Sequence, residues 1–124
     1  MPSATIVHNV ILATLTRQIH VDAMIDTGAS LCVIPVSFAR ALGFRPENRL
    51  RQRVVNVVGG QVQMDIHRLE YVKVRSAKAH NVTFGAFDTF PNSRMPLIGH
   101  TFMAKFTTIT FDLAGKRVVF RRRG

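Results

Sequence analysis

The stretch of sequence that decides the fold reads Met24-Ile25-Asp26-Thr27-Gly28-Ala29-Ser30, with a carboxylate and a glycine between two apolar segments. Apolar and polar residues alternate over residues 18–25, a period of two that predicts a half-buried β-strand ending just before Asp26. Residues 31–34 form a second apolar run, which Pro35 ends. The predicted order is therefore strand, short loop and strand, with the carboxylate at the start of the loop.

The rest of the chain predicts more strands and little helix. Residues 10–15 are apolar and are expected to pair with residues 18–25 as an antiparallel hairpin. Residues 36–42, followed by Gly43 as a C-cap, predict a short helix, and residues 99–106 predict a second one. Further β-type runs lie at residues 69–75, 81–84, 107–111 and 117–120. We expect one all-β domain over residues 1–124.

A second hairpin is predicted in the middle of the chain. Gly59-Gly60 separates the β-type runs 54–58 and 61–64, and the freedom of glycine at positive φ suits a two-residue turn. The preceding residues, 45–53, are expected to form an exposed basic connector. That connector contains Arg45, Arg49, Arg51 and Arg53.

Composition limits the classes of function. The 124 residues suffice for one hydrophobic core and are too few for a bilobed enzyme. The single Cys32 and five scattered histidines predict no disulfide, no metal site and no cofactor. No apolar run approaches the ~20 residues of a membrane helix, so no membrane segment is expected. A cytoplasmic location is favoured, with a domain released from a membrane-anchored precursor as the alternative.

Asp26 differs from the other six carboxylates because apolar strands enclose it. Burial of an isolated carboxylate is costly unless backbone donors or a partner hold it, so we expect a desolvated group held by its loop. Gly28 permits a sharp turn that aims backbone N–H groups at the carboxylate, and Thr27 offers a hydroxyl that could tie the loop down. An ordinary turn has the same tripeptide, so the context has to decide.

In that context the sequence resembles the retropepsin-like aspartic proteases, especially their bacterial single-domain members. Residues 24–30 match the catalytic loop of that family, and the hairpin around Gly59-Gly60 falls where the family has its flap. Leu97-Ile98-Gly99 matches the apolar-apolar-Gly element that crosses beneath the loop. The resemblance covers nearly the whole chain. It implies a single-lobe closed β-barrel with one or two short helices and a flap hairpin.

The resemblance also implies an activity and roles for residues. Asp26 would supply the catalytic carboxylate, Thr27 would brace the loop, and Gly28 would donate backbone contacts near the carboxylate. The chemistry needs two carboxylates, and this chain has one Asp-Thr-Gly. We therefore expect an aspartic endopeptidase acting on peptide or protein substrates as a C2 homodimer. The expected substrate-binding residues are Ala29, Val57, Val58, Gly59, Gly60, Leu97, Ile98 and Gly99.

Two other functions are weighed against this one. The same fold could serve as a non-catalytic dimerisation or peptide-binding module, although the intact residues 26–28 argue against it. The net charge of +10 and the arginines at 45–53 and 121–123 would suit a basic nucleic-acid-binding β-barrel. That reading leaves Asp26 unexplained, so nucleic acid is not the expected partner. In a protease, the charge would favour substrates with acidic flanks.

Overall fold

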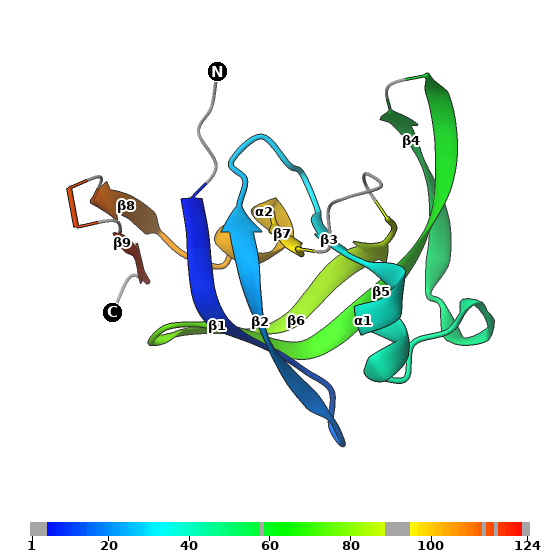
Figure 1. Cartoon of the computed structure of the whole chain (residues 1–124), viewed down its shortest axis with the longest axis horizontal. Helices are drawn as coiled ribbons and strands as arrows, with labels where there is room; N and C mark the ends of the chain where they lie inside the picture. Colours follow the sequence, from blue (N-terminus) through cyan, green and yellow to red (C-terminus); the bar gives the residue numbers. More distant parts are fainter. Residues whose placement is uncertain (1–4, 58, 89–94, 113, 116, 123–124) are drawn as a thin grey trace.

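The computed structural model describes residues 5–57, 59–88, 95–112, 114–115 and 117–122, and in this part of the chain it is mainly β, as predicted (Figure 1). The strands are β1 (Thr5–Ala13), β2 (Gln18–Ile25), β3 (Cys32–Ile34), β4 (Arg51–Val57), β5 (Gly60–Val74), β6 (Ala77–Ala86), β7 (Leu97–Ile98), β8 (Thr108–Asp112) and β9 (Arg117–Arg121). The helical segments are α1 (Val36–Ala41), the 3₁₀ turn η1 (Pro46–Asn48) and α2 (His100–Met103).

Six of the strands close into a barrel. Hydrogen-bonded neighbours follow the order β1-β2-β7-β3-β6-β5-β4, and β1 pairs in addition with β5. The closing contact is short and antiparallel, with Leu12 opposite Val72 at its centre. Closure removes the open edges of these six strands. It leaves β4 outside the circuit, as the outer strand of the β4–β5 hairpin.

The two-residue strand β7 lies between β2 and β3, although it is far from both in the chain. It runs parallel to β2, with Met24 opposite Leu97 and Ile25 opposite Ile98. It runs antiparallel to β3, with Val33 opposite Leu97. The strands on either side of the Asp26 loop are therefore held apart by the segment before Gly99.

Apolar side chains fill the barrel and form its main core. Successive residues of a strand point to opposite faces: Cys32 and Ile34 of β3 belong to this core, whereas Leu31 and Val33 belong to a second, smaller cluster on the other face. The largest fully buried side chains of the main core include Phe84, Phe102, Leu12, Ile25, Ile34, Leu69 and Ile98. The second cluster comprises Leu31, Met64 and Ile66, with Val33, Val55 and Phe87 packed against it.

The predicted elements exist, with changed bounds. The β1–β2 hairpin forms, but β1 begins at Thr5, and Leu15 lies in the turn with 85% of its surface exposed. The runs 61–64 and 69–75 belong to one continuous strand, β5. Both short helices are present, and α2 is shorter than predicted.

The prediction that residues 45–53 form a basic connector is wrong at the C-terminal end of that segment. Arg51, Gln52 and Arg53 are the first residues of β4 and pair with β5. All three are exposed. A hairpin that projects from the barrel does not have to bury its side chains. The hydrophobicity of residues 51–53 therefore gave no indication that they begin a strand.

The last two strands form a separate two-stranded sheet beside the barrel. Phe120 of β9 packs against Phe102 and Phe106, with ring centroids 5.2 and 5.3 Å apart. Arg122 donates a hydrogen bond to the Lys78 carbonyl, and its guanidinium lies 4.8 Å from the centre of the Phe106 ring. These contacts attach the C-terminal hairpin to the barrel. Among the described residues, no helix has the length and apolar character needed to span a membrane.

Candidate active site

Asp26 lies directly after β2 and is held by backbone groups on both sides. Its N–H donates to the Ile98 carbonyl at 3.0 Å, and its carbonyl accepts the Ala29 N–H at 3.2 Å. Its Oδ1 accepts the Gly28 N–H at 2.9 Å. The loop is thus a tight turn that orients its own carboxylate. Asp26 is half-buried, not fully desolvated as the sequence suggested, because the neighbouring Thr27 and Gly28 are exposed.

The segment from β7 into α2 supports this turn from beneath. A Cβ atom on Gly99 would lie 2.4 Å from the Leu31 carbonyl oxygen and 2.7 Å from that of Ala29, so the two backbones approach as closely as glycine allows. The His100 N–H donates to the Ala29 carbonyl at 2.9 Å. The His100 ring donates from Nε2 to the Thr27 carbonyl at 2.8 Å. Two hydrogen bonds from one residue therefore clamp the Asp-Thr-Gly loop.

A partly buried chain of polar contacts lies below this clamp. The Thr101 hydroxyl donates to the Thr83 carbonyl at 2.6 Å and accepts the Cys32 N–H at 3.0 Å, which joins α2, β3 and β6. Cys32 Sγ lies 3.3 Å from the Gly99 nitrogen, which donates to it. Burial raises the pKa of the Cys32 thiol. Cys32 is therefore a buried free thiol whose neutral form is favoured.

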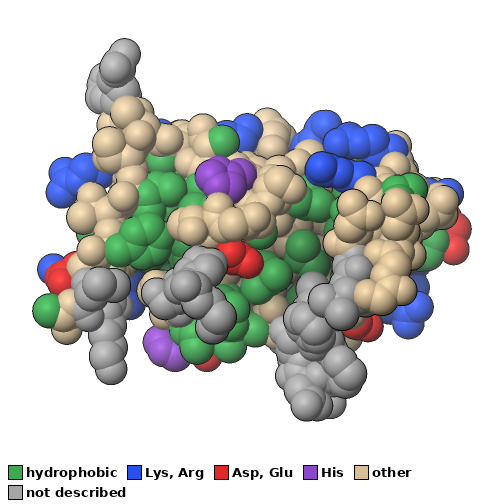
Figure 2. All heavy atoms as spheres, turned by 90° about the horizontal axis from the view of Figure 1, so that it is seen from above, with side chains coloured by type: hydrophobic (Ala, Val, Ile, Leu, Met, Phe, Trp, Pro, Cys, Tyr) green, Lys and Arg blue, Asp and Glu red, His purple; other side chains and the backbone are tan. Residues whose placement is uncertain are grey.

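An apolar wall flanks the loop on the face opposite the main core. Leu31 and Val33 point to this face, and Leu97 shares it because it lies directly opposite Val33. Val55 of β4 and Phe87 pack against the same cluster. In Figure 2, which views the molecule from above, hydrophobic side chains reach the surface in the middle of the face, beside an acidic side chain. Val33 and Phe87 were not among the predicted site residues, because only the tertiary structure shows that they pack against this cluster.

The β4–β5 hairpin projects on the same side of the molecule as the loop between β2 and β3 (Figure 1). Gly59 and Gly60 are exposed at its tip and have φ of 94° and 145°, the backbone region that favours glycine. Val57 ends β4 opposite Gly60. The Val57 side chain and Val58, both expected to contact substrate, lie outside the described part of the structure.

The remaining predicted substrate contacts separate into two groups. Ala29 and Leu97 are half-buried beside the loop, so part of each residue is exposed at the surface. Ile98 is fully buried in the main core, so its side chain is not available to a substrate, contrary to the expectation. Gly99 is also buried, against the backbone of residues 29 and 31. Both act through the backbone, because they bring β7 and α2 against the loop.

The other carboxylates lie elsewhere, and most have partners of their own. Asp22 lies 3.1 Å from His8, Asp65 lies 3.5 Å from Arg49, Asp88 accepts the Val36 N–H, and Asp112 accepts the Gly115 N–H and contacts Arg117. The remaining two are Glu47 in η1 and Glu70 in β5. Among the described residues, no group of three or more His, Cys, Asp or Glu side chains could hold a metal ion.

Two further surface features do not coincide with the loop. The arginine-rich segments at 45–53 and 121–122 lie at opposite ends of the molecule, so they do not form one continuous basic surface (Figure 1). A surface pocket of about 550 Å³ lies between the β1–β2 turn and residues 42–48. None of the predicted site residues lines it.

Comparisons with known proteins agree with this geometry. The aspartyl protease family model matches residues 12–102 of the chain. A retropepsin-like aspartic protease from Rickettsia conorii, known from a crystal structure, superposes with a TM-score of 0.62 at 20% sequence identity. The match covers 90% of this chain and 95% of that one. At this identity the likeness shows a shared retropepsin-like fold. A comparison with curated proteins finds no match.

Proposed function

This chain belongs to the aspartyl protease family, and on that premise we propose that it is a homodimeric aspartic endopeptidase that needs no cofactor. One observation carries the proposal: the Asp26 carboxylate accepts the Gly28 N–H at 2.9 Å in a loop that His100 clamps from beneath. A carboxylate oriented in this way, half-exposed beside an apolar wall, can accept a proton from a water molecule that attacks a bound peptide.

Peptide hydrolysis by this chemistry needs two carboxylates that share one proton, because two like charges so close cannot both persist. The ionised carboxylate takes a proton from the water molecule while the water oxygen bonds to the scissile carbonyl carbon. The protonated carboxylate donates to the carbonyl oxygen. The carboxyl group that took the water proton then gives it to the leaving nitrogen, while the other carboxylate takes a proton back from a hydroxyl of the tetrahedral intermediate. The C–N bond breaks, which yields a new carboxyl and a new amino terminus and leaves the pair again sharing one proton.

The second carboxylate has to come from a second copy of the chain. Only residues 26–28 form an Asp-Thr-Gly, and no other carboxylate lies in this loop. A two-fold axis beside the loop would bring the two Asp26 side chains together. In a dimer with two-fold symmetry, both subunits use the same surface patch for the contact. Thr27 and Gly28, both exposed, would then lie at the contact between the subunits.

The apolar wall and the hairpin suggest how a peptide is held. Val33, Val55 and Leu97 offer an apolar surface to side chains of an extended substrate. The glycine-tipped hairpin can close over the peptide and exclude water. We therefore propose extended, largely apolar segments as the cleaved sequences, with Ala29, Gly59 and Gly60 contacting their backbone.

A pair of aspartate variants tests the assignment. Asp26→Asn should abolish cleavage of a peptide library at every pH from acid to neutral while the melting temperature stays close to that of the wild type. Asp22→Asn is the matched control, because Asp22 lies on the same strand but is exposed and paired with His8. It should cleave normally. Cleavage by Asp26→Asn at the wild-type rate would contradict the assignment.

Mixing experiments test the dimer separately. When wild-type chain and Asp26→Asn chain exchange subunits freely, activity should fall as the square of the wild-type fraction, because both carboxylates are required. A linear fall, or full activity in a strict monomer by sedimentation, would contradict the dimer. If the wild type bound peptides but cleaved none at any pH, the non-catalytic peptide-binding module would replace the proposal.

A further inference from the structure

Two arginines, Arg51 and Arg53, lie on the face of the β4–β5 hairpin that looks toward the Asp26 loop. Residues directly opposite each other in an antiparallel pair share one face of the sheet. Arg51 pairs with Ile66 and Arg53 with Met64. Ile66 and Met64 are buried in the cluster that contains Leu31, five residues beyond Asp26. The two arginines therefore lie on the outer strand β4, on the same (inner) face of the hairpin as the apolar wall and next to its buried residues on β5.

The position of Val55 confirms which face this is. Val55 is two residues beyond Arg53 on the same strand, so both side chains point to the same side. Val55 packs against the cluster around Leu31. Alternate residues of a strand are about 6.6 Å apart. A peptide whose apolar side chain contacts Val55 would thus present its flanking residues within reach of the guanidinium of Arg53.

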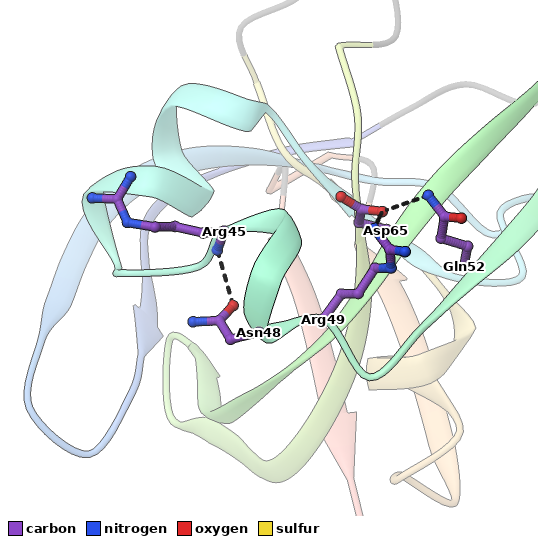
Figure 3. A network of polar contacts seen from close by, with 5 residues as sticks. All are labelled: Arg45, Asn48, Arg49, Gln52 and Asp65. Carbon is purple, nitrogen blue, oxygen red and sulfur yellow. Dashed lines mark hydrogen bonds and ion pairs between the residues drawn. The ribbon is translucent and has the colours of Figure 1, made fainter.

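Both guanidinium groups are available to a ligand. Arg51 and Arg53 are exposed, and within the described residues neither guanidinium takes part in a hydrogen bond or an ion pair. The nearby Arg49 differs, because it lies 3.5 Å from Asp65, a carboxylate that also accepts a hydrogen bond from Gln52 (Figure 3). Asp65 lies opposite Gln52, on the other face of the hairpin, and so does not neutralise the inner face.

The charge of the surroundings agrees with this reading. The chain carries 17 Lys and Arg against 7 Asp and Glu, so the field around the site attracts anions. Figure 2 shows Lys and Arg side chains gathered in the right-hand part of the face, toward the end of the molecule that carries β4 and β5. A guanidinium binds a carboxylate with two parallel hydrogen bonds, which matches a Glu or Asp side chain well.

We propose that Arg51 and Arg53 form a subsite that selects peptides with acidic side chains flanking an apolar segment. The inference rests on the proposed function of the Asp26 site and assigns that site a substrate class. Arg53 binds the acidic residue nearer to the apolar segment, and Arg51 binds one farther out, since alternate side chains of an extended peptide match the spacing of the two arginines.

The test compares two peptides with the same apolar centre, one flanked on both sides by Glu and the other by Gln. The wild type should cleave the Glu peptide with a kcat/KM about fivefold higher or more, as expected for exposed charge pairs. The preference should shrink in about 0.5 M salt, which screens such pairs. In the double variant Arg51→Gln/Arg53→Gln, kcat/KM for the two peptides should become equal, because the charge that distinguishes Glu from Gln no longer has a partner.

Arg40→Gln/Arg75→Gln is the matched control, because both arginines are also exposed but lie on α1 and in the turn between β5 and β6, away from the hairpin. It removes the same two charges and should keep the preference. Loss of the preference in this control as well would show that net charge alone is responsible and would overturn the subsite. Equal cleavage of both peptides by the wild type would also overturn it.

A binding measurement separates this proposal from the proposed activity. Fluorescence anisotropy with labelled Glu and Gln peptides needs no catalysis and can use the Asp26→Asn chain. If the wild type cleaves nothing but the Glu peptide binds more tightly in an Arg51- and Arg53-dependent way, the subsite stands and the proposed activity fails. If no preference for the Glu peptide is seen in binding or cleavage, the subsite is wrong.

Discussion

Gly99 offers the sharpest test of how the site is built. Its φ of −109° is open to any residue, so an alanine there meets no backbone strain. The added Cβ would instead lie 2.4 Å from the Leu31 carbonyl oxygen, 2.7 Å from the Leu31 carbonyl carbon and 2.7 Å from the Ala29 carbonyl oxygen. All three are backbone atoms and cannot rotate away. Gly99→Ala must therefore push α2 away from the loop that carries Asp26.

The cost of that displacement follows from the contacts it strains. Overpacking of a tight interior typically costs about 1–3 kcal/mol. The displacement also weakens the hydrogen bond from the His100 N–H to the Ala29 carbonyl, which contributes about 1 kcal/mol. We expect a loss of about 3 kcal/mol in the free energy of unfolding. For a domain of this size, that corresponds to a fall of about 10 °C in melting temperature.

Thermal unfolding followed by circular dichroism measures this loss, at one protein concentration because the stability of the proposed dimer depends on it. Gly28→Ala is the matched control. It makes the same substitution in the same loop, but its nearest neighbour, Asp26 Oδ1, is 3.4 Å from the new Cβ, an ordinary contact. Gly28→Ala should melt within about 3 °C of the wild type. If Gly99→Ala did the same, the close packing of β7 and α2 against the loop would not contribute to stability as argued.

Two histidines allow further predictions. His100→Phe removes the donor to the Thr27 carbonyl and should lower kcat about tenfold or more by loosening the loop, whereas His100→Gln, which keeps an N–H donor, should recover most of the activity. Ring ¹⁵N NMR of the wild type should show His100 protonated at Nε2, and a His100→Phe variant as active as the wild type would contradict this role. Burial against Phe44 and Phe84 lowers the pKa of His67 below its ordinary 6.5, partly opposed by Asp65. Below about pH 6.5 the unfolded chain therefore binds more protons than the folded one, and stability falls as the pH drops toward the lowered pKa. Urea unfolding from pH 5 to 8 should show a shallower pH dependence for His67→Phe, and an unchanged slope would refute the assignment.

Local patterns were sufficient for the elements on either side of Asp26. The period of two in residues 18–25 and Pro35 after the next apolar run predicted β2, the loop and β3 within about one residue. Gly59-Gly60 predicted the turn of the β4–β5 hairpin in the same way. These features depend on residues that are neighbours in the chain, so the sequence alone contains the signal.

Contacts between distant segments carried no such signal. The hydrogen bond from His100 to Thr27 joins residues 73 positions apart. The direction of Val33 toward the apolar wall depends on sheet register, as does the position of Arg51 and Arg53 on the inner face of the hairpin. A shift of register by one residue would turn each of these side chains to the opposite face.

The sequence by itself determined that the chain has one Asp-Thr-Gly loop between two strands, because that pattern is local and the carboxylates are few. Only the tertiary structure decided how the loop is held and what surrounds it. The insertion of β7 between β2 and β3 brings Gly99 and His100 beneath Asp26. Pairing between strands far apart in the chain produces this arrangement. Backbone hydrogen bonds, the His100 ring and the lack of a side chain on Gly99 hold it together.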